Sequence, residues 1–329
     1  MSNDVWVVAE HARGQLSEST LETVGKGREL AHATGGKLVA LLLTDDERNQ
    51  INSLAAADLI LLARRPEFRE FTPEAYGGAI EAALKEAPPR LVLMGSTSVG
   101  LDLLSVLSAR TGFACLDSCT RLDLRASQLL ATCQIYGGKL FVEVALSSAT
   151  TLVAVVPGSF AKPADQPSGR PEVRELTLPA DLPVSRITFH RLIEPPSGDV
   201  DITKVPILVA VGRGIQNADN LPLAGELAEA LGGAVCASRP VIDQGWLPLT
   251  RQVGKSGMTV KPKLYLALGI SGAPEHLEGM KQSELIVAVN TDPKAPIFGA
   301  AHYGAVTDVV ELIPMLTEEA RKQGLKKAS

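Results

Sequence analysis

The fold is decided by residues 264–308, which read LYLALGISGAPEHLEGMKQSELIVAVNTDPKAPIFGAAHYGAVTD. Two apolar runs in this stretch, 264–268 and 285–289, are long enough for buried strands and too short for helices. The first run is followed by a glycine-rich turn at 269–272 and by a plausible helix with His276 in its first turn. The order strand, turn, helix, strand predicts a parallel β-α-β unit.

Such a unit binds ligands beyond the carboxyl ends of its strands, where free backbone N–H groups at a helix start favour anionic groups. The glycines are not spaced as GxGxxG, and the lysine of a P-loop is missing. The pattern alone therefore leaves two interpretations open. One is a site for a nucleotide or phosphorylated cofactor, and the other is an ordinary tight turn between a strand and a helix.

Length and composition favour a two-domain protein with aliphatic cores. The chain has 329 residues, of which 45% are hydrophobic and only 4% aromatic. A net charge of −5 without a long basic run argues against nucleic acid as a partner. No apolar stretch approaches the ~18 residues of a membrane span, and the polar start Ser2-Asn3-Asp4 shows no signal peptide. We therefore predict a cytoplasmic protein without a membrane span.

The four cysteines are too few and too scattered for a disulfide framework. Cys115 and Cys119 could be read as half of a metal site, but no second cysteine pair or nearby histidine completes it. The sequence therefore predicts buried thiols and no metal.

The first half alternates predicted strands and helices, which favours a mostly parallel sheet with helices on both faces. The strands are expected at 5–9, 37–43, 58–63 and 91–94, and the helices at about 19–34 and 76–86, followed by β-rich residues 115–156 and a loop at 162–174. The small-residue loop 95–100 follows one of these strands and could hold a phosphate. A fold outline alone does not establish such a site.

The second half repeats the alternation after a proline-rich segment. Because consecutive prolines stiffen a spacer and exclude helix, we predict a linker at 195–204 around Pro195-Pro196, between domains at 1–194 and 205–329. Further strands are expected at 206–211 and 234–237, and further helices at about 221–231 and 309–323. The predicted fold class is α/β, with a mostly parallel sheet and flanking helices in each domain.

The second half also carries short motifs in a characteristic order. They are Gly212-Arg213-Gly214, Ala237-Ser238-Arg239, Asp243, Gln252-Val253-Gly254-Lys255-Ser256-Gly257, residues 264–273, His276-Leu277, Gly279-Met280-Lys281, Asn290-Thr291-Asp292-Pro293 and Ala295-Pro296-Ile297-Phe298. In this order they resemble the C-terminal FAD-binding domain of the electron transfer flavoprotein α subunit. The resemblance implies a Rossmann-like FAD-binding fold at 205–329, and a docking domain at 1–194 that resembles a nucleotide-binding fold but holds no nucleotide.

The resemblance assigns roles to individual residues around the flavin. It implies that His276 lies at the edge near N1 and the C2 carbonyl, that Arg239 lies over the ring near N5, and that Ser256 donates toward N5. Taken singly, these residues read as a helix cap, a solvated arginine and a turn residue; their joint occurrence favours function. The implied cofactor-binding set is Arg213, Ser238, Arg239, Gln252, Val253, Gly254, Ser256, Gly269, Ser271, Gly272, His276, Asn290 and Asp308.

Three departures from the family pattern accompany the match. Pro274-Glu275 replaces an Ile-Gln pair, Lys255 replaces a glutamine, and His302 stands where an aspartate is common. The negative charge of Glu275 is expected to lower the flavin potential or to pair with Lys255. These changes indicate a retuned flavin or a divergent subgroup of the family, and not the loss of FAD.

The resemblance implies an electron carrier and not an independent enzyme, with no catalytic residues of its own. The chain would form a heterodimer with a β subunit, accept electrons from dehydrogenases such as acyl-CoA dehydrogenases of fatty acid β-oxidation, and pass them to a quinone oxidoreductase or another acceptor. Two alternatives stay open. One is the α subunit of an electron-bifurcating, NADH-linked form, and the other is an adenine-nucleotide-binding regulatory or adenylate-processing protein that uses the loop 95–100.

Overall fold

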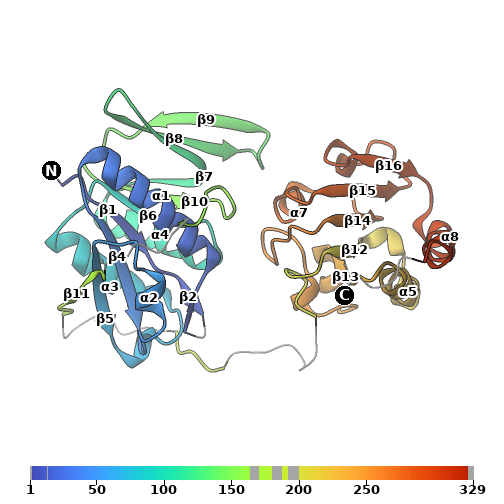
Figure 1. The fold of residues 1–329 in the computed structure, drawn as a ribbon, viewed down its shortest axis with the longest axis horizontal. Coiled ribbons are helices and arrows are strands. Elements are labelled where there is room, and N and C mark those ends of the chain that lie inside the picture. The colour runs from blue at the N-terminus through green and yellow to red at the C-terminus, as the bar shows by residue number, and fades with distance from the viewer. Residues whose placement is uncertain (1, 13, 164–169, 180–186, 192–199, 325–329) are drawn as a thin grey trace. The chain divides into compact units, whose positions relative to one another are not determined.

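A computed structural model describes residues 2–12, 14–163, 170–179, 187–191 and 200–324 (Figure 1). The chain divides into two compact units, residues 1–191 and 192–329. The division falls near the domain boundary predicted from the double proline. Within the predicted linker, residues 195–199 lie outside the described residues.

Unit 1 is built on a nine-stranded sheet with the order β11-β5-β4-β1-β6-β10-β7-β8-β9. The strands from β11 to β7 are parallel, and β8 and β9 continue the sheet as antiparallel neighbours. The strands are β1 (Val5–Val8), β4 (Leu38–Thr44), β5 (Leu59–Arg64), β6 (Leu91–Gly95), β7 (Ala114–Arg125), β8 (Gln128–Ile135), β9 (Leu140–Ala145), β10 (Thr151–Val155) and β11 (Glu172–Glu175), with β2 (His11–Ala12) and β3 (Gln15–Leu16) as a separate hairpin. The central order β5-β4-β1-β6 is that of a doubly wound dinucleotide-binding fold.

Helices cover both faces of this sheet, as predicted. They are α1 (Glu18–Thr34), α2 (Gln50–Ser53), α3 (Pro73–Glu86) and α4 (Ser98–Thr111). Because side chains alternate along a strand, Val5 and Val7 of β1 join one core with α1, while Trp6 and Val8 join a second core with α3 and α4. Helix α1 begins within one residue of the predicted start, and Ser17 is its N-cap.

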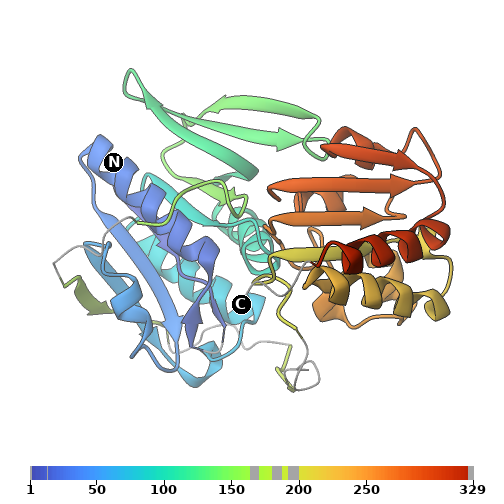
Figure 2. The same ribbon diagram turned by 45° about the vertical axis from the view of Figure 1, so that its right-hand side comes forward.

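Unit 2 contains a five-stranded, fully parallel sheet with the order β13-β12-β14-β15-β16. The strands are β12 (Ile207–Val211), β13 (Ala234–Ala237), β14 (Leu264–Leu268), β15 (Leu285–Asn290) and β16 (Tyr303–Val306), and the helices are α5 (Leu221–Leu231), α6 (Arg239–Asp243), α7 (Pro274–Glu278) and α8 (Val309–Lys322). Helices α5 and α8 lie side by side on one face (Figure 2). The strand order is the flavodoxin-like order of doubly wound folds, in which ligands bind beyond the carboxyl ends of the strands.

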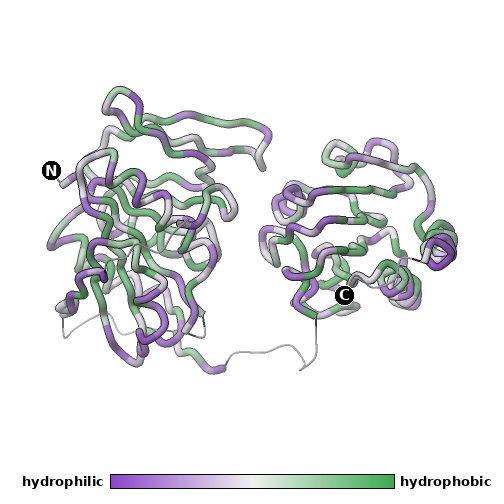
Figure 3. The backbone as a smooth tube through the Cα atoms, viewed as in Figure 1, coloured by the Kyte–Doolittle hydropathy of each residue, from purple (hydrophilic) through white to green (hydrophobic). Residues whose placement is uncertain are grey.

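The β-α-β unit predicted from the sequence is confirmed. β14 and β15 are parallel neighbours in the register Leu264↔Leu285 to Leu268↔Val289, joined through α7. In Figure 3 hydrophobic residues follow the central strands of the sheets in both units. The predicted helix 221–231 coincides with α5, and the predicted helix 309–323 coincides with α8 to within one residue.

The structure also corrects some predictions. The segment 162–174 was expected to be a loop, but β11 (Glu172–Glu175) pairs with β5. All four residues of this edge strand are exposed, so no hydrophobic pattern marks it. Of the thiols predicted to be buried, Cys119 is buried but Cys115 is exposed. No group of three or more His, Cys, Asp or Glu side chains in the described ranges could hold a metal ion.

Candidate functional site

A cavity of about 440 Å³ lies at the carboxyl end of the sheet in unit 2. It is enclosed by the start of α6, the loop 252–256, the turn after β14 and the start of α7. Its lining residues are Ser238, Arg239, Pro240, Asp243, Gln252, Val253, Gly254, Lys255, Ser256, Ile270, Ser271, Gly272, Ala273, Glu275 and His276. Its volume is within the range of cofactor pockets, about 300–1,000 Å³.

Nine of the thirteen residues proposed for the cofactor line this cavity. They are Ser238, Arg239, Gln252, Val253, Gly254, Ser256, Ser271, Gly272 and His276. These residues come from three separate stretches of sequence. Two of the stretches follow β13 and β14 at the carboxyl edge of the sheet. The third is joined to the end of β13 by the bond from Val253 N to the Ala237 carbonyl at 2.9 Å. The remaining four, Arg213, Gly269, Asn290 and Asp308, do not line it.

His276 is held on both sides by the protein. It is only 6% exposed, and its Nδ1 lies 3.1 Å from the Val253 carbonyl while its Nε2 lies 3.0 Å from the Tyr265 hydroxyl. Burial lowers the pKa of His276 from its ordinary 6.5 to about 4, although the bond to the Val253 carbonyl opposes the change. The imidazole is therefore neutral at pH 7.

The loop 252–256 fixes the direction of a hydroxyl. The Gln252 amide donates to Ser256 Oγ at 2.9 Å, so the hydroxyl proton of Ser256 is left for another acceptor. The loop is closed by two backbone bonds, from Met258 N to the Gln252 carbonyl at 2.7 Å and from Gly254 N to the Met258 carbonyl at 3.2 Å. A serine in this position can thus act as a donor into the cavity.

Two glycines of the cavity lining pack closely against neighbouring backbone. Gly254 has a φ of +143°, and its α-carbon faces the carbonyl of Glu275 in α7. Gly272 has a φ of +86°, and a β-carbon there would collide with the backbone of Ile297. Both φ values are in a region that side chains rarely adopt. The two glycines, called the glycine cradle below, therefore hold two parts of the cavity lining tightly against neighbouring backbone.

Charged groups at the rim are paired within the protein. Arg239, whose side chain is 68% exposed, lies with Nε 3.3 Å from Asp243 one turn further along α6. Of the two effects expected for Glu275, a lower flavin potential or an ion pair with Lys255, the ion pair is not formed: the Lys255 ammonium group lies 3.9 Å from Glu278. Only the backbone N–H of Lys255 contacts Glu275, by donating to its carbonyl at 2.7 Å.

Arg213 and Gly269 lie where the ends of β12 and β14 meet. The chain on both sides of Arg213 is glycine, and Gly214 packs directly against Gly269, with a bond of 3.0 Å from Gly214 N to the Gly269 carbonyl. Arg213 itself is exposed beside this contact. The glycines therefore have a structural role at the point where the strand order reverses.

Asn290 and Asp308 also have structural partners. The Asn290 amide donates to the Ile270 carbonyl at 2.9 Å and thereby holds the turn after β14. Asp308 caps α8 by accepting from Val310 N at 2.7 Å, and its second oxygen accepts from Gln216 at 3.1 Å. A role of these two residues in holding the adenosine stays a prediction.

His302, the third departure from the family pattern, is bonded twice to the neighbouring strand. The ring Nδ1 of His302 accepts from Ile286 N at 3.0 Å, and the backbone N–H of His302 donates to the Ile286 carbonyl at 2.9 Å. The residue therefore anchors the start of β16 and lies outside the cavity lining.

Tyr265, the partner of His276, was not among the residues predicted from the sequence. This tyrosine is the second residue of β14 and is fully buried in an otherwise aliphatic strand. A buried tyrosine hydroxyl usually has a hydrogen-bond partner. A tyrosine within the apolar run 264–268 therefore indicates a buried hydroxyl that needs a partner, and this could have been recognised from the sequence.

In unit 1 the loop 95–100 is hydrogen-bonded to a carboxylate of the protein. Thr97 caps α4 and donates to the carboxylate of Glu10 at 2.7 Å. Burial raises the pKa of Glu10, and the bond from Thr97 opposes the change. Glu10 follows β1 and Thr97 follows β6, so a carboxylate lies at the carboxyl ends of these neighbouring strands, the edge at which this strand order binds ligands. The geometry argues against a phosphate in this loop.

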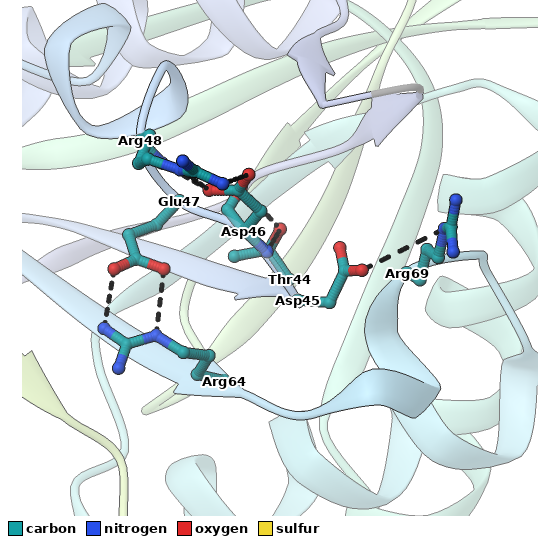
Figure 4. Close-up of polar contacts among 7 residues, drawn as sticks. All are labelled: Thr44, Asp45, Asp46, Glu47, Arg48, Arg64 and Arg69. Carbon is teal, nitrogen blue, oxygen red and sulfur yellow. Dashed lines mark hydrogen bonds and ion pairs between the residues drawn. The ribbon is translucent and has the colours of Figure 1, made fainter.

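The neighbouring edge of the same sheet carries paired charges (Figure 4). Arg64 contacts Glu47 through two bonds of 2.6 and 2.9 Å, and Arg48 contacts Asp46 through two bonds of 2.7 and 2.8 Å. Two-point pairs of this kind occupy the guanidinium donors that would bind a phosphate. The arginines at this edge are therefore committed to carboxylates.

The strand order and the crevice of unit 2 define a doubly wound protein that binds a nucleotide-type cofactor. Two family models match the chain: "Electron transfer flavoprotein domain" over residues 5–181 and "Electron transfer flavoprotein FAD-binding domain" over residues 201–281.

Three relatives match nearly the whole chain. Protein FixB of Clostridium saccharobutylicum is 36% identical, covering 97% of this chain and 96% of that protein. The electron transfer flavoprotein subunit alpha of Thermoanaerobacterium thermosaccharolyticum is 35% identical, covering 97% and 98%. Subunit LctC of the lactate dehydrogenase (NAD(+),ferredoxin) of Acetobacterium woodii is 34% identical, covering 95% and 75%.

The chain belongs to the electron transfer flavoprotein α-subunit family, which includes FixB. Its cofactor is FAD, it serves electron transport, and its family forms heterodimers with a β subunit. None of the helices within the described ranges has both the length and the apolar character needed to cross a membrane.

Proposed function

We propose that this chain is the FAD-carrying subunit of a heterodimer that accepts electrons from dehydrogenases, acyl-CoA dehydrogenases among them, and delivers them to a quinone oxidoreductase or another acceptor. The observation that carries this proposal is the cavity of unit 2, which combines a glycine cradle with Arg239, Ser256 and His276. We place the protein in the cytoplasm.

The residues present fit FAD. Backbone groups beside Gly254 and Gly272 would hold the ribityl chain and pyrophosphate, because backbone N–H groups favour anionic groups and the tight packing at these glycines fixes the backbone there. Arg239, Ser256 and His276 would surround the flavin ring. When bound, FAD takes up and releases electrons one or two at a time, and the protein sets which state is stable.

The side chains of the cavity supply a positive charge and a hydrogen-bond donor. The guanidinium of Arg239 supplies a fixed positive charge, and Asp243 orients it from one turn away. Ser256 supplies a hydroxyl donor. Because the Gln252 amide donates to its oxygen, the hydroxyl hydrogen points away from Gln252. Such preoriented donors stabilise negative charge more than mobile water does, because they need no reorganisation.

One experiment tests the proposal directly. The chain co-expressed with its β subunit is expected to purify as a yellow heterodimer with one FAD in the cavity of unit 2, and Arg239→Leu is expected to bind FAD about tenfold more weakly. Titration of the FAD-depleted heterodimer with FAD, followed by absorption and fluorescence, measures both.

The control for that variant is Arg321→Leu. Arg321 is similarly exposed, at 59%, and is also ion-paired, but on α8 and with Glu226. A heterodimer that stays colourless in excess FAD would contradict the proposal, and equal FAD affinity in the two variants would contradict the role of Arg239.

The electron-bifurcating form is the second candidate, favoured by the similarity to LctC, whose name joins NAD(+) and ferredoxin. Reduction of the heterodimer by NADH alone would support this form. An adenine-nucleotide regulator is disfavoured because the Glu10 carboxylate, bonded to Thr97, lies at the edge of the unit 1 sheet where this strand order binds ligands. A rise in melting temperature with ATP but not with FAD would favour it.

We also propose that the hairpin of β8 and β9 is a contact of the β subunit. β9 is the last strand of its sheet, and the hairpin exposes a group of large apolar side chains. They are Ile135 (38% exposed), Tyr136 (74%), Leu140 (55%), Phe141 (61%) and Val142 (39%). An apolar group of this kind at an open sheet edge is typical of a protein interface.

Phe141→Asp tests this contact. Since a central aromatic residue of an interface contributes about 2 kcal/mol or more, we expect the heterodimer to dissociate about 30-fold more readily. Sedimentation velocity over a dilution series measures the change. The matched control is Val173→Asp in β11, an exposed residue (42%) of the strand at the other end of the same sheet. Equal dissociation constants for the two variants would rule the hairpin out.

A further inference from the structure

The buried pair of Tyr265 and His276 extends into a chain of polar groups. The His276 ring lies between the Val253 carbonyl and the Tyr265 hydroxyl, at 3.1 and 3.0 Å. The same hydroxyl also contacts the thiol of Cys236 on β13. Both Tyr265 and Cys236 are fully buried, at 0% exposure. The side chains of His276, Tyr265 and Cys236 are thus neighbours in unit 2, and His276 also meets the Val253 carbonyl.

The Val253 carbonyl fixes the direction of both hydrogen bonds of the His276 ring. A carbonyl oxygen can only accept, so Nδ1 of His276 carries a hydrogen and donates it to Val253. In the neutral ring Nε2 then has only a lone pair, and it accepts from the Tyr265 hydroxyl. The neutral imidazole therefore has its one N–H directed at the protein and none toward the cavity.

The tyrosine hydroxyl can reverse its hydrogen-bonding role toward the ring. Because it can both donate and accept, it can also receive a hydrogen bond from a protonated Nε2 if its own hydrogen turns toward Cys236. The two bonds of the ring would then persist in both protonation states. Phenylalanine in this position would leave Nε2 unpaired in either state.

We infer that Tyr265 is a positioning residue for His276: its hydroxyl donates to Nε2 of the neutral ring and accepts from Nε2 once the ring gains a proton. The proton comes from water, and no covalent bond of Tyr265 breaks, since only its O–H group rotates. A hydrogen bond from a charged donor is about twice as strong as one between neutral groups. Tyr265 therefore favours the protonated ring, which places a positive charge beside the flavin when negative charge develops there.

Other charged groups lie around the pair on each packed element. Arg239 and Asp243 of α6, Lys255 of the loop, and Glu275 of α7 line the same cavity, and Glu278 holds Lys255. The low pKa of His276 is caused by burial and not by any of these charges. Burial likewise raises the pKa of Tyr265 well above its ordinary value, so the phenol keeps its proton.

The test has two readouts, of which the second rests on the proposed function. The first is nitrogen NMR of the cofactor-free full chain labelled with ¹⁵N-histidine, which contains five histidines. Wild-type His276 is expected to show the Nδ1–H form at pH 7, with a hydrogen-bonded Nε2. In Tyr265→Phe the Nε2 resonance is expected to move downfield, to the position of an unbonded ring nitrogen.

The second readout is the reduction potential of FAD in the heterodimer as a function of pH. A plot of the potential against pH changes slope at the pH where His276 gains a proton on reduction. In Tyr265→Phe this pH is expected to fall by about one unit, which is a tenfold loss of proton affinity. A purely structural role would leave this pH unchanged. A heterodimer without FAD would contradict the proposed function and leave the NMR test intact.

Tyr76→Phe is a matched control in unit 1. Tyr76 is also buried and lies 3.2 Å from a histidine nitrogen, Nε2 of His11. Each variant should move the resonances of its own histidine only. The inference is overturned if wild-type His276 shows the Nε2–H form, a result that needs no variant, or if Tyr265→Phe leaves both the Nε2 resonance and the pH profile unchanged.

Discussion

Gly272→Ala is expected to destabilise unit 2 by about 3–5 kcal/mol and to abolish FAD binding. Gly272 has a φ of +86°, and a β-carbon there would meet the backbone N and α-carbon of Ile297. Left-handed backbone at alanine and a backbone collision each cost about 1–3 kcal/mol. Relief by local movement is restricted, because Ile297 N donates to the adjoining Ser271 carbonyl at 3.0 Å. The loss is a large fraction of the ordinary stability of a domain, about 5–15 kcal/mol.

Gly225→Ala in α5 is the control for this variant. An added β-carbon there meets nothing within 4 Å, so the substitution should stabilise the helix by about 0.5–1 kcal/mol. Urea unfolding gives the stability of both variants, and absorption at the flavin maximum gives the FAD content of the heterodimer. Near-wild-type stability and colour in Gly272→Ala would show that the turn after β14 is not the rigid part of a cradle.

The elements predicted correctly are those with a strong hydrophobic pattern. The all-buried strand β4 and the amphipathic helices α5 and α8 were located to within a residue or two. The elements that were missed lack such a pattern. All four residues of β11 and of β16 are exposed, and α6 has only five residues, too few for a helical period. Backbone pairing to a neighbour defines these elements, and the pairing depends on the rest of the fold.

The candidate site was likewise predictable only in part. Its backbone was predictable, because motifs after parallel strands meet at one edge and glycines mark close approach. The choice of ion-pair partner was not. The backbone N–H of Lys255 donates to the Glu275 carbonyl, so these two segments do meet as expected, yet the ammonium group reaches Glu278. Side-chain reach depends on local backbone direction, which a sequence pattern does not contain.

Acidification is expected to destabilise unit 2, and His276 is expected to account for about 3 kcal/mol of the loss. The pKa of His276 is about 4 in the folded chain and an ordinary 6.5 after unfolding. Between these pH values the unfolded chain binds the proton that the folded chain excludes, so the free energy of unfolding falls as the pH falls. The contribution begins below pH 6.5 and is complete near pH 4. At pH 7 the histidine has no such effect.

The positions of the two tryptophans allow the unfolding of unit 2 to be measured separately. Unit 1 contains Trp6 and unit 2 contains Trp246, which packs against the core beneath α5 and α8. In a Trp6→Phe background, the fluorescence of Trp246 during urea unfolding at pH 7 and pH 4.5 reports on unit 2 alone. His276→Gln keeps hydrogen-bonding capacity but cannot titrate, so it should lose less stability than the wild type between the two pH values. Carboxylates such as Asp201, whose pKa is lowered mainly by the Thr203 hydroxyl, act equally in both proteins. Parallel losses in the two proteins would show that the buried imidazole takes up its proton without unfolding, and that its burial does not destabilise the charged form.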